Sequence, residues 1–279
     1  MKPVMTSLRH TESKGFTLIE MVISITVLGI LSTSAAVFLR GPITSYFDTE
    51  RRADLSDAGG LAMAKLSQEI SRAVPNSVRV TTVSATEFYL EFLPVLSEGR
   101  YRSAAPGNPL DFGVPDTGFD ALCAAPAVPC PSPGNWVVVN NHLPGANVWM
   151  GGSRAGPVNV AGATLTYPSD TFAPPPAATD APDHRFQIAG QPVTYACRAG
   201  ELRRYSGYPF QAAQVMNAAS PQITAASNND MLADGILACQ AMQIPGNLRR
   251  AQVVALTLNF DNAGDRLNLY HVIRVEPLP

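Results

Sequence analysis

The sequence predicts an α+β fold, in which a long N-terminal helix with a membrane-spanning first half packs on an antiparallel β-sheet with long Pro-rich loops. Three observations lead to this prediction. Residues 16–39 form an apolar run in which Glu20 is the one formally charged residue. Residues 43–73 repeat apolar side chains at helical spacing. From residue 77 onward, segments rich in β-branched and aromatic residues are separated by turn-forming residues.

The apolar run is long enough to cross a membrane. At about 1.5 Å per residue, a helix over this run reaches roughly 36 Å, against a hydrocarbon core of about 30 Å. The preceding residues include Lys2, Arg9 and Lys14, and positive charge on this side favours a cytoplasmic N-terminus. We therefore expect a single-pass anchor with the C-terminal domain outside the cytoplasm.

Helical periodicity continues beyond the apolar run. Pro42 lacks a backbone N–H, so we expect a kink or break there, and Pro75 is a natural stop. Gly59 and Gly60 weaken the helix or allow another backbone to approach closely. The apolar stripe that we expect to dock on a folded domain consists of Ile43, Tyr46, Phe47, Leu55, Ala58, Leu61, Ala62, Leu66, Ile70 and Ala73. The chain thus divides into a leader (1–15), a transmembrane half of the helix (16–40), an amphipathic half (41–75) and a β-rich domain (76–279).

The β-rich domain is predicted to contain hairpins and long loops. The predicted strands cover residues 77–83, 87–93, 136–140, 184–188, 193–198, 201–205, 252–260 and 266–275. The first two strands form a hairpin that turns near residues 84–86, and the last two pair through a turn at residues 261–265. Residues 94–134 and 151–183 are rich in Pro and Gly, so we expect loops there.

Charge and cysteine content restrict the partners and the compartment. The formal net charge is −2 and there are no long basic runs, which argues against nucleic acid as a partner. Cys123, Cys130, Cys197 and Cys239 all follow the anchor, and an even count in an exported domain predicts two disulfides. Of the three possible connectivities we favour Cys123–Cys130 with Cys197–Cys239. A metal site is disfavoured, because no CxxC spacing or nearby His pair accompanies these cysteines.

No motif in the sequence indicates catalysis. His10, His142, His184 and His271 occur in no Gly-x-Ser-x-Gly, His-Glu-x-x-His or Gly-rich phosphate-loop setting. The sequence therefore predicts a protein that is not an enzyme and that needs no cofactor or metal. We expect His271 to lie on the surface or on a sheet face.

Two further groups of side chains have both a functional and a structural interpretation. Oxygen ligands for Ca²⁺ could come from two segments, but neither has the spacing of an EF-hand, so we favour a plain turn and a plain loop. These residues are Asp261, Asn262 and Asp265 in the first segment and Asn228, Asn229, Asp230 and Asp234 in the second. Aromatic side chains could form a surface for a glycan or receptor, but core packing is favoured. They are Trp136, Trp149, Tyr205, Tyr208 and Phe210.

The stretch Gly15-Phe16-Thr17-Leu18-Ile19-Glu20 resembles the class III signal of type IV prepilins and type II secretion pseudopilins. The resemblance implies that a prepilin peptidase cleaves between Gly15 and Phe16 and that Phe16 is then N-methylated. It also implies that Glu20 neutralises the free amine of a neighbouring subunit when the helices bundle. A pair of opposite charges is what a low-dielectric helix bundle can accommodate. The apolar run follows this cleavage site, so it is retained as an anchor, unlike a secretory signal.

A narrower resemblance extends past the anchor. Residues 46–55, 73–77, 195–197 and 200–204 look like the MshO family of minor prepilins in MSHA pilus biogenesis. This implies a minor pilin at or near the pilus tip that supports assembly. Its partners would be prepilin peptidase, other minor and major pilin subunits and the inner-membrane assembly platform, with the β-rich domain periplasmic before it reaches the cell surface. The alternatives are a J-type pseudopilin of type II secretion, or a tip adhesin whose loop around Cys123–Cys130 binds a surface or glycan.

Overall fold

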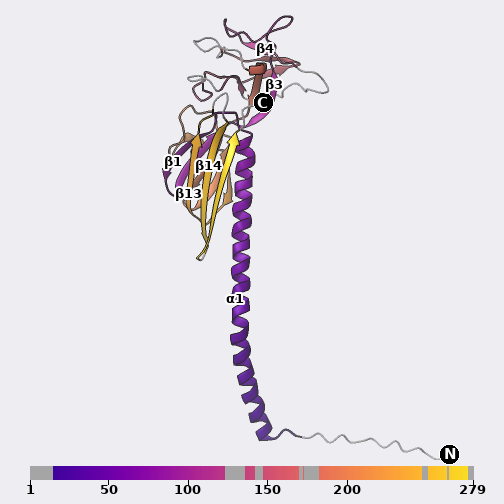
Figure 1. Cartoon of the computed structure of the whole chain (residues 1–279), viewed down its shortest axis with the longest axis vertical. Helices are drawn as coiled ribbons and strands as arrows, with labels where there is room; N and C mark the ends of the chain where they lie inside the picture. Colours follow the sequence, from indigo (N-terminus) through magenta and orange to yellow (C-terminus); the bar gives the residue numbers. More distant parts are fainter. Residues whose placement is uncertain are drawn as a thin grey trace, which may run out of the picture. The chain divides into compact units, whose positions relative to one another are not determined.

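The computed structural model describes residues 15–122, 136–141, 147–169, 172, 182–246, 251–262 and 264–275. The chain divides into two compact units, Met1–Arg52 and Ala53–Pro279, which are described separately below. The predicted α+β class is confirmed, because a long N-terminal helix is followed by antiparallel sheets (Figure 1). Cys123, Cys130, His10 and His142 lie outside the described residues.

Helix α1 covers Leu18–Ser71 without interruption, so of the predicted kink or break at Pro42 the break is wrong (Figure 1). The proline ring fixes φ at a value that a helix also uses, and the cost is one missing backbone hydrogen bond with local crowding. Beside it, the Thr44 hydroxyl donates to the carbonyls of Arg40 at 3.0 Å and Gly41 at 2.9 Å. The helix ends at Ser71, before the predicted stop at Pro75.

The part of α1 from residue 53 onward lies in the larger unit and packs on the main core. Its buried residues are Gly59, Ala62, Met63, Leu66 and Ile70. They repeat at intervals of three and four, which places them on one helix face. The predicted stripe was wrong at Leu61, which is 73% exposed, and at Ala58, which is also exposed. It was wrong too at Ile43, Tyr46 and Phe47, which are exposed in the smaller unit.

Two antiparallel sheets surround this core, and the predicted hairpins are confirmed within them. The first sheet has the order β1-β2-β10-β11-β12 and the second β13-β14-β15. The strands are β1 (Arg79–Ser84), β2 (Glu87–Phe92), β10 (Val193–Arg198), β11 (Glu201–Ser206), β12 (Asn228–Ala233), β13 (Ile236–Ile244), β14 (Gln252–Asn262) and β15 (Asp265–Val275). The short helix α2 (Pro221–Thr224) precedes β12.

Strands β12 and β13 were not predicted. Residues 228–233 were expected to be a plain loop, but they pair with β11 as an edge strand whose first residues are exposed and polar. An exposed edge strand needs no apolar alternation, so its composition resembles that of a loop. In β13, a register shift between Ile236 and Ala238 interrupts the alternation that would have identified the strand.

The described residues between 95 and 189 form a β-rich insertion with its own core. The strands predicted at residues 136–140 and 184–188 are confirmed, but further short strands lie where long loops had been predicted. The sheets of the insertion have the orders β3-β9-β5-β6 and β4-β8-β7. Tyr101, Phe119, Leu165 and Phe186 are fully or almost fully buried between them. The strands are β3 (Val95–Arg100), β4 (Gly118–Asp120), β5 (Trp136–Val138), β6 (Arg154–Ala155), β7 (Asn159–Ala161), β8 (Thr164–Thr166) and β9 (Arg185–Ala189), with a 3₁₀ turn at Pro182–His184. Several strands are only two or three residues long, so no periodic signal could build up in the sequence.

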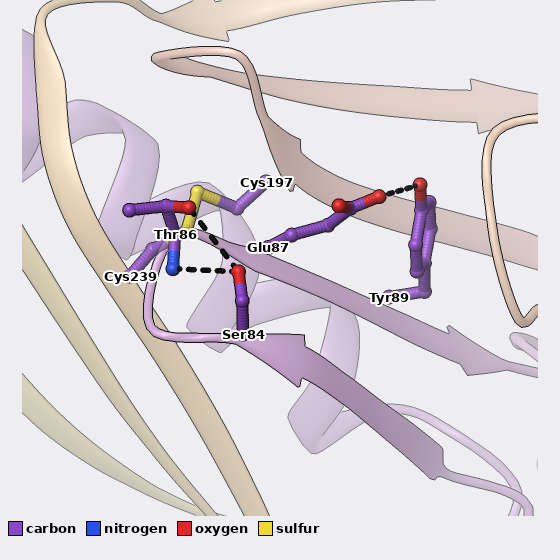
Figure 2. The surroundings of a disulfide bond; sticks show 6 residues. All are labelled: Ser84, Thr86, Glu87, Tyr89, Cys197 and Cys239. Carbon is purple, nitrogen blue, oxygen red and sulfur yellow. Dashed lines mark hydrogen bonds between the residues drawn. A yellow bond between two sulfur atoms is a disulfide. The ribbon is translucent and has the colours of Figure 1, made fainter.

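The disulfide Cys197–Cys239 confirms one of the two favoured pairings and joins β10 to β13, and hence the two main sheets. Figure 2 shows Ser84 and Thr86 of the β1–β2 turn beside it. The turn is held by a hydrogen bond of 3.1 Å from the Thr86 amide to the Ser84 hydroxyl. The Cys239 amide also donates to the Ala85 carbonyl at 2.9 Å, so the hairpin, β10 and β13 meet at this point.

Candidate functional site: the apolar N-terminal helix

The start of α1 has a defined helix cap. Thr17 precedes the first helical residue, and its hydroxyl oxygen accepts a hydrogen bond of 3.3 Å from the Glu20 amide. The Thr17 carbonyl accepts a second bond of 3.2 Å from the Met21 amide. Thr at the cap with Glu three residues later is the residue pattern of a capping box. Hence residues within the stretch that resembles a prepilin signal also start the helix.

Glu20 is exposed, and its carboxylate has no partner among the described residues. Its position in the first turn is favourable, since the N-terminal end of a helix carries partial positive charge. The neighbouring side chains Phe16 and Leu18 are 77% and 82% exposed and apolar. Within the described part of the chain, Glu20 is therefore an unpaired carboxylate on an apolar surface.

The rest of the apolar run is suited to an environment without water. Its large side chains from Leu18 to Leu39 are exposed along the helix. The hydroxyls of Ser24, Thr26 and Thr33 donate to helix carbonyls three or four residues earlier, at 2.8–3.0 Å. These polar groups therefore need no outside partner. Among the described residues, α1 is the one helix long and apolar enough to span a membrane, and its most apolar window is entirely unburied.

The comparison with protein families agrees with the interpretation of this apolar helix as a membrane anchor. Residues 11–36 match the family model described as the prokaryotic N-terminal methylation motif. The match supports the class of type IV prepilins and pseudopilins: structural subunits that are processed at the N-terminus, anchored in the membrane and assembled into a pilus. No curated protein and no solved structure matches the chain. The narrower likeness to the MshO family gains no support, since the matched residues end at 36.

The aromatic residues considered as a binding surface are divided between two environments. Trp149, Tyr205 and Tyr208 are buried, which confirms core packing for these three. Trp136 and Phe210 are half-buried and pack against the same cluster as Trp149. The Phe210 ring stacks on Trp149 with centroids 5.1 Å apart and lies 5.5 Å from Trp136.

A buried polar network that the sequence analysis missed lies below these rings. Arg79 donates through Nε to Glu91 Oε2 at 2.7 Å, and Glu91 Oε1 accepts from the Tyr208 hydroxyl at 3.1 Å. The Nη atoms of Arg79 donate to the carbonyls of Gln211, Ala212 and Ala213 at 2.7–2.9 Å. Arg79 and Glu91 are direct partners across β1 and β2, so a correct hairpin register could have revealed the pair.

The electrostatics of this network follow from its burial. Removal from water raises the pKa of the Glu91 carboxyl and lowers the pKa of the Arg79 guanidinium, while their mutual attraction opposes both shifts. Burial also raises the pKa of the Tyr208 hydroxyl. Because Arg79 binds three successive carbonyls, the network fixes residues 211–213 to the main sheet. We assign it a structural role.

The remaining candidate residues are not brought together. His271 Nε2 lies 3.1 Å from the Ser67 hydroxyl, whereas His184 packs against Tyr101 in the insertion, with ring centroids 5.5 Å apart. Asp261 accepts a hydrogen bond of 3.2 Å from the Gly264 amide, as a plain turn requires. Within the part of the chain that the structure describes, no three His, Cys, Asp or Glu side chains form a possible metal site.

Proposed function

We propose that this protein is a minor pilin of an MSHA-type type IV pilus. It inserts into the inner membrane with its N-terminus in the cytoplasm, is processed by prepilin peptidase, and is incorporated at or near the pilus tip, where it supports assembly. One observation carries the proposal: an exposed apolar helix half with a single unpaired carboxylate, Glu20, directly after the Gly15–Phe16 signal. Its partners are other minor and major pilin subunits and the inner-membrane assembly platform.

The proposed role of Glu20 follows from its surroundings. An unpaired carboxylate near the centre of a bilayer costs about 2.5 kcal/mol or more. Cleavage after Gly15 would leave an amine on Phe16, and packing against a neighbouring helix would place that amine beside Glu20. The two opposite charges then stabilise each other in the low-dielectric helix bundle. Assembly is thereby coupled to processing, since an uncleaved subunit has no amine at Phe16.

Mass spectrometry of the purified mature protein tests the processing step. The expected N-terminus is Phe16 with a methylated amine. Gly15→Trp should block cleavage and leave the leader attached. An intact leader on the parental protein, or unchanged processing of Gly15→Trp, would contradict the assignment.

The assembly role of Glu20 is tested by comparing two carboxylates on α1. Glu20→Val should insert into the membrane normally but be reduced in sheared filaments, as measured by immunoblot. Glu50→Gln is the matched control, because Glu50 is exposed on the same helix beyond the apolar run. Parental levels of Glu20→Val in filaments would exclude charge pairing. Immunogold labelling then locates the subunit, and label on a type II secretion pseudopilus would favour the J-type alternative.

A second candidate function is adhesion at the pilus tip. The observation that favours it is the insertion at residues 95–189, which has its own buried core and is not needed to complete the main sheets. An inserted β-structure of this kind can carry a binding surface independently of the assembly helix. Attachment assays that retain normal piliation distinguish adhesion from assembly.

A further inference from the structure

A row of stacked cationic and aromatic side chains joins the insertion to the main sheet. Arg79 Cζ lies 3.7 Å from the centre of the Trp149 ring, and Trp149 stacks on Phe210. The other side of the row is Arg154 of β6, with Cζ 3.6 Å from the centre of Phe210 and 4.4 Å from that of Trp136. We call Arg79, Trp149, Phe210, Arg154 and Trp136 the aromatic ladder. Its members come from distant parts of the sequence.

The two arginines of the ladder differ in how their charge is balanced. Arg79 has a carboxylate partner in Glu91, with Nη2 2.6 Å from Oε2. Arg154 donates through Nε to the Val148 carbonyl at 2.7 Å, and no carboxylate of the described residues pairs with it. Burial lowers the pKa of the Arg154 guanidinium, although an arginine remains protonated. Arg154 is thus a half-buried cation without a counter-charge among these residues.

The orientation of Arg154 leaves one part of the guanidinium available. Its guanidinium carbon lies close to the rings of both Phe210 and Trp136, and its Nε is bound to Val148. The residue is half-buried, and among the described residues its printed hydrogen bond uses Nε, so the Nη atoms are the donors that remain for a ligand. A guanidinium edge presents parallel N–H donors that fit the two oxygens of a carboxylate. Because the rings already fix the side chain, little conformational freedom is lost on binding.

We propose that Arg154 and Trp136 form a binding site for an acidic saccharide, in which Arg154 takes the carboxylate of a hexuronate unit and Trp136 contacts the sugar ring. The half-buried indole of Trp136 lies directly beside the guanidinium and supplies an apolar surface with a polar tip. The site rests on the adhesion function that was proposed second and specifies its class of ligand. It does not depend on filament assembly. If Arg154 were only a structural link, the site would bind no ligand.

The test uses intrinsic fluorescence, since both tryptophans of the chain, Trp136 and Trp149, belong to the ladder. The full-length protein in detergent micelles is titrated with sodium glucuronate at constant ionic strength. We expect a saturable change with a dissociation constant of about 1 mM, typical of a single weakly bound sugar acid. Trp136→Phe should remove most of the signal. Glucose, acetate and inorganic phosphate should bind at least about tenfold more weakly, because each lacks either the carboxylate or the sugar ring.

The variants separate a binding role from a structural one. Arg154→Gln should weaken glucuronate binding by about tenfold or more, as expected for loss of a charge-assisted pair. Arg154→Lys keeps the charge but not the paired donors, so it should also weaken glucuronate binding. If circular dichroism shows that Arg154→Gln does not fold, the binding measured for Arg154→Lys tests the proposal instead. Arg100→Gln, at an exposed arginine of β3 in the same insertion, should bind as the parent does.

Four results would overturn the proposal. These are the absence of saturable glucuronate binding, equal binding of acetate or phosphate, unchanged binding by folded Arg154 variants, and equal weakening by Arg100→Gln. Failure of this test would leave filament incorporation untouched. Failure of Glu20→Val to reduce incorporation would likewise leave the saccharide site intact.

Discussion

The two halves of α1 differ in where their apolar side chains find partners. In the first half, large side chains around the whole helix are exposed, Leu28 at 60% among them. In the second half, one face is buried against the sheets, with Leu66 and Ile70 completely inaccessible. A helix that is apolar all round needs partners on all sides, whereas an amphipathic helix needs one folded surface. The first half therefore depends on surroundings outside its own chain.

The two halves should differ most in how truncation of a leucine changes the free energy of unfolding. Leu66→Ala should lower the free energy of unfolding of the β-rich unit by about 2–5 kcal/mol, because it leaves a cavity in the main core. Leu28→Ala removes the same atoms from an exposed position and should change that free energy by no more than about 0.5 kcal/mol. Urea unfolding of the full-length protein in detergent, followed by tryptophan fluorescence, measures both.

Equal effects of the two leucine variants on the free energy of unfolding would contradict the difference between the two halves, since they would mean that the first half also packs on the folded unit. A small effect of Leu66→Ala alone would show that the neighbouring side chains collapse into the space. In that case Ile70→Ala, at an equally buried position one turn later, provides a second measurement.

The disulfide should have the next largest effect, confined to the second half of α1 and its sheets. Cys197 and Cys239 belong to the same core as Leu66, and the bond closes a segment with a sequence separation of 42. Replacing both cysteines by alanine should lower the free energy of unfolding by about 2–4 kcal/mol, chiefly by relaxing the unfolded chain.

Hydrogen exchange of the disulfide variant tests whether the loss of stability is confined to the sheets and leaves the first half of α1 unchanged. Amides in β10 and β13 should exchange faster, while those in the first half of α1 should keep their parental rates. Faster exchange near Glu20 would contradict this separation. A further loss of stability when the double variant is treated with a reductant would be the sign of the second predicted bond, Cys123–Cys130.

How much of the fold could be predicted depends on the number of residues over which each sequence pattern extends. The apolar run, the amphipathic stripe and the β14–β15 hairpin extend over many residues; the run and the hairpin were predicted, and the stripe was predicted correctly only in part. The pairing Cys197–Cys239 was favoured because Cys123 and Cys130 are close in sequence and could close a Pro-rich loop, although the sequence leaves three connectivities open. Glu20 could be singled out because a lone carboxylate in an apolar run is conspicuous without any three-dimensional information.

The insertion and the aromatic ladder could not be predicted, for a different reason. The strand β6 is two residues long, and its residue Arg154 gains its environment from Trp136 on the paired strand β5 and from Phe210, which is remote in sequence. Proline and glycine between such short strands give the composition of a loop. Phe186 and Tyr101 were hydrophobic residues in apparent loops, which is the one signal that could have suggested a second core.

The smallest predicted effect concerns the adjacent residues Gly59, which is buried against the sheets, and Gly60, which is exposed. A Cβ at Gly59 would lie 2.7 Å from Leu269 Cδ1 and 3.1 Å from the Phe260 ring, whereas one at Gly60 would meet nothing within 4 Å. Gly59→Ala should lower the free energy of unfolding by about 1–3 kcal/mol through overpacking, even though alanine favours helix. Gly60→Ala should raise it by about 0.5–1 kcal/mol, because only the helix preference remains. Opposite signs in urea unfolding would confirm that β14 and β15 contact α1 at Gly59, while stabilisation by both variants would show that the helix does not pack there as closely as these distances indicate.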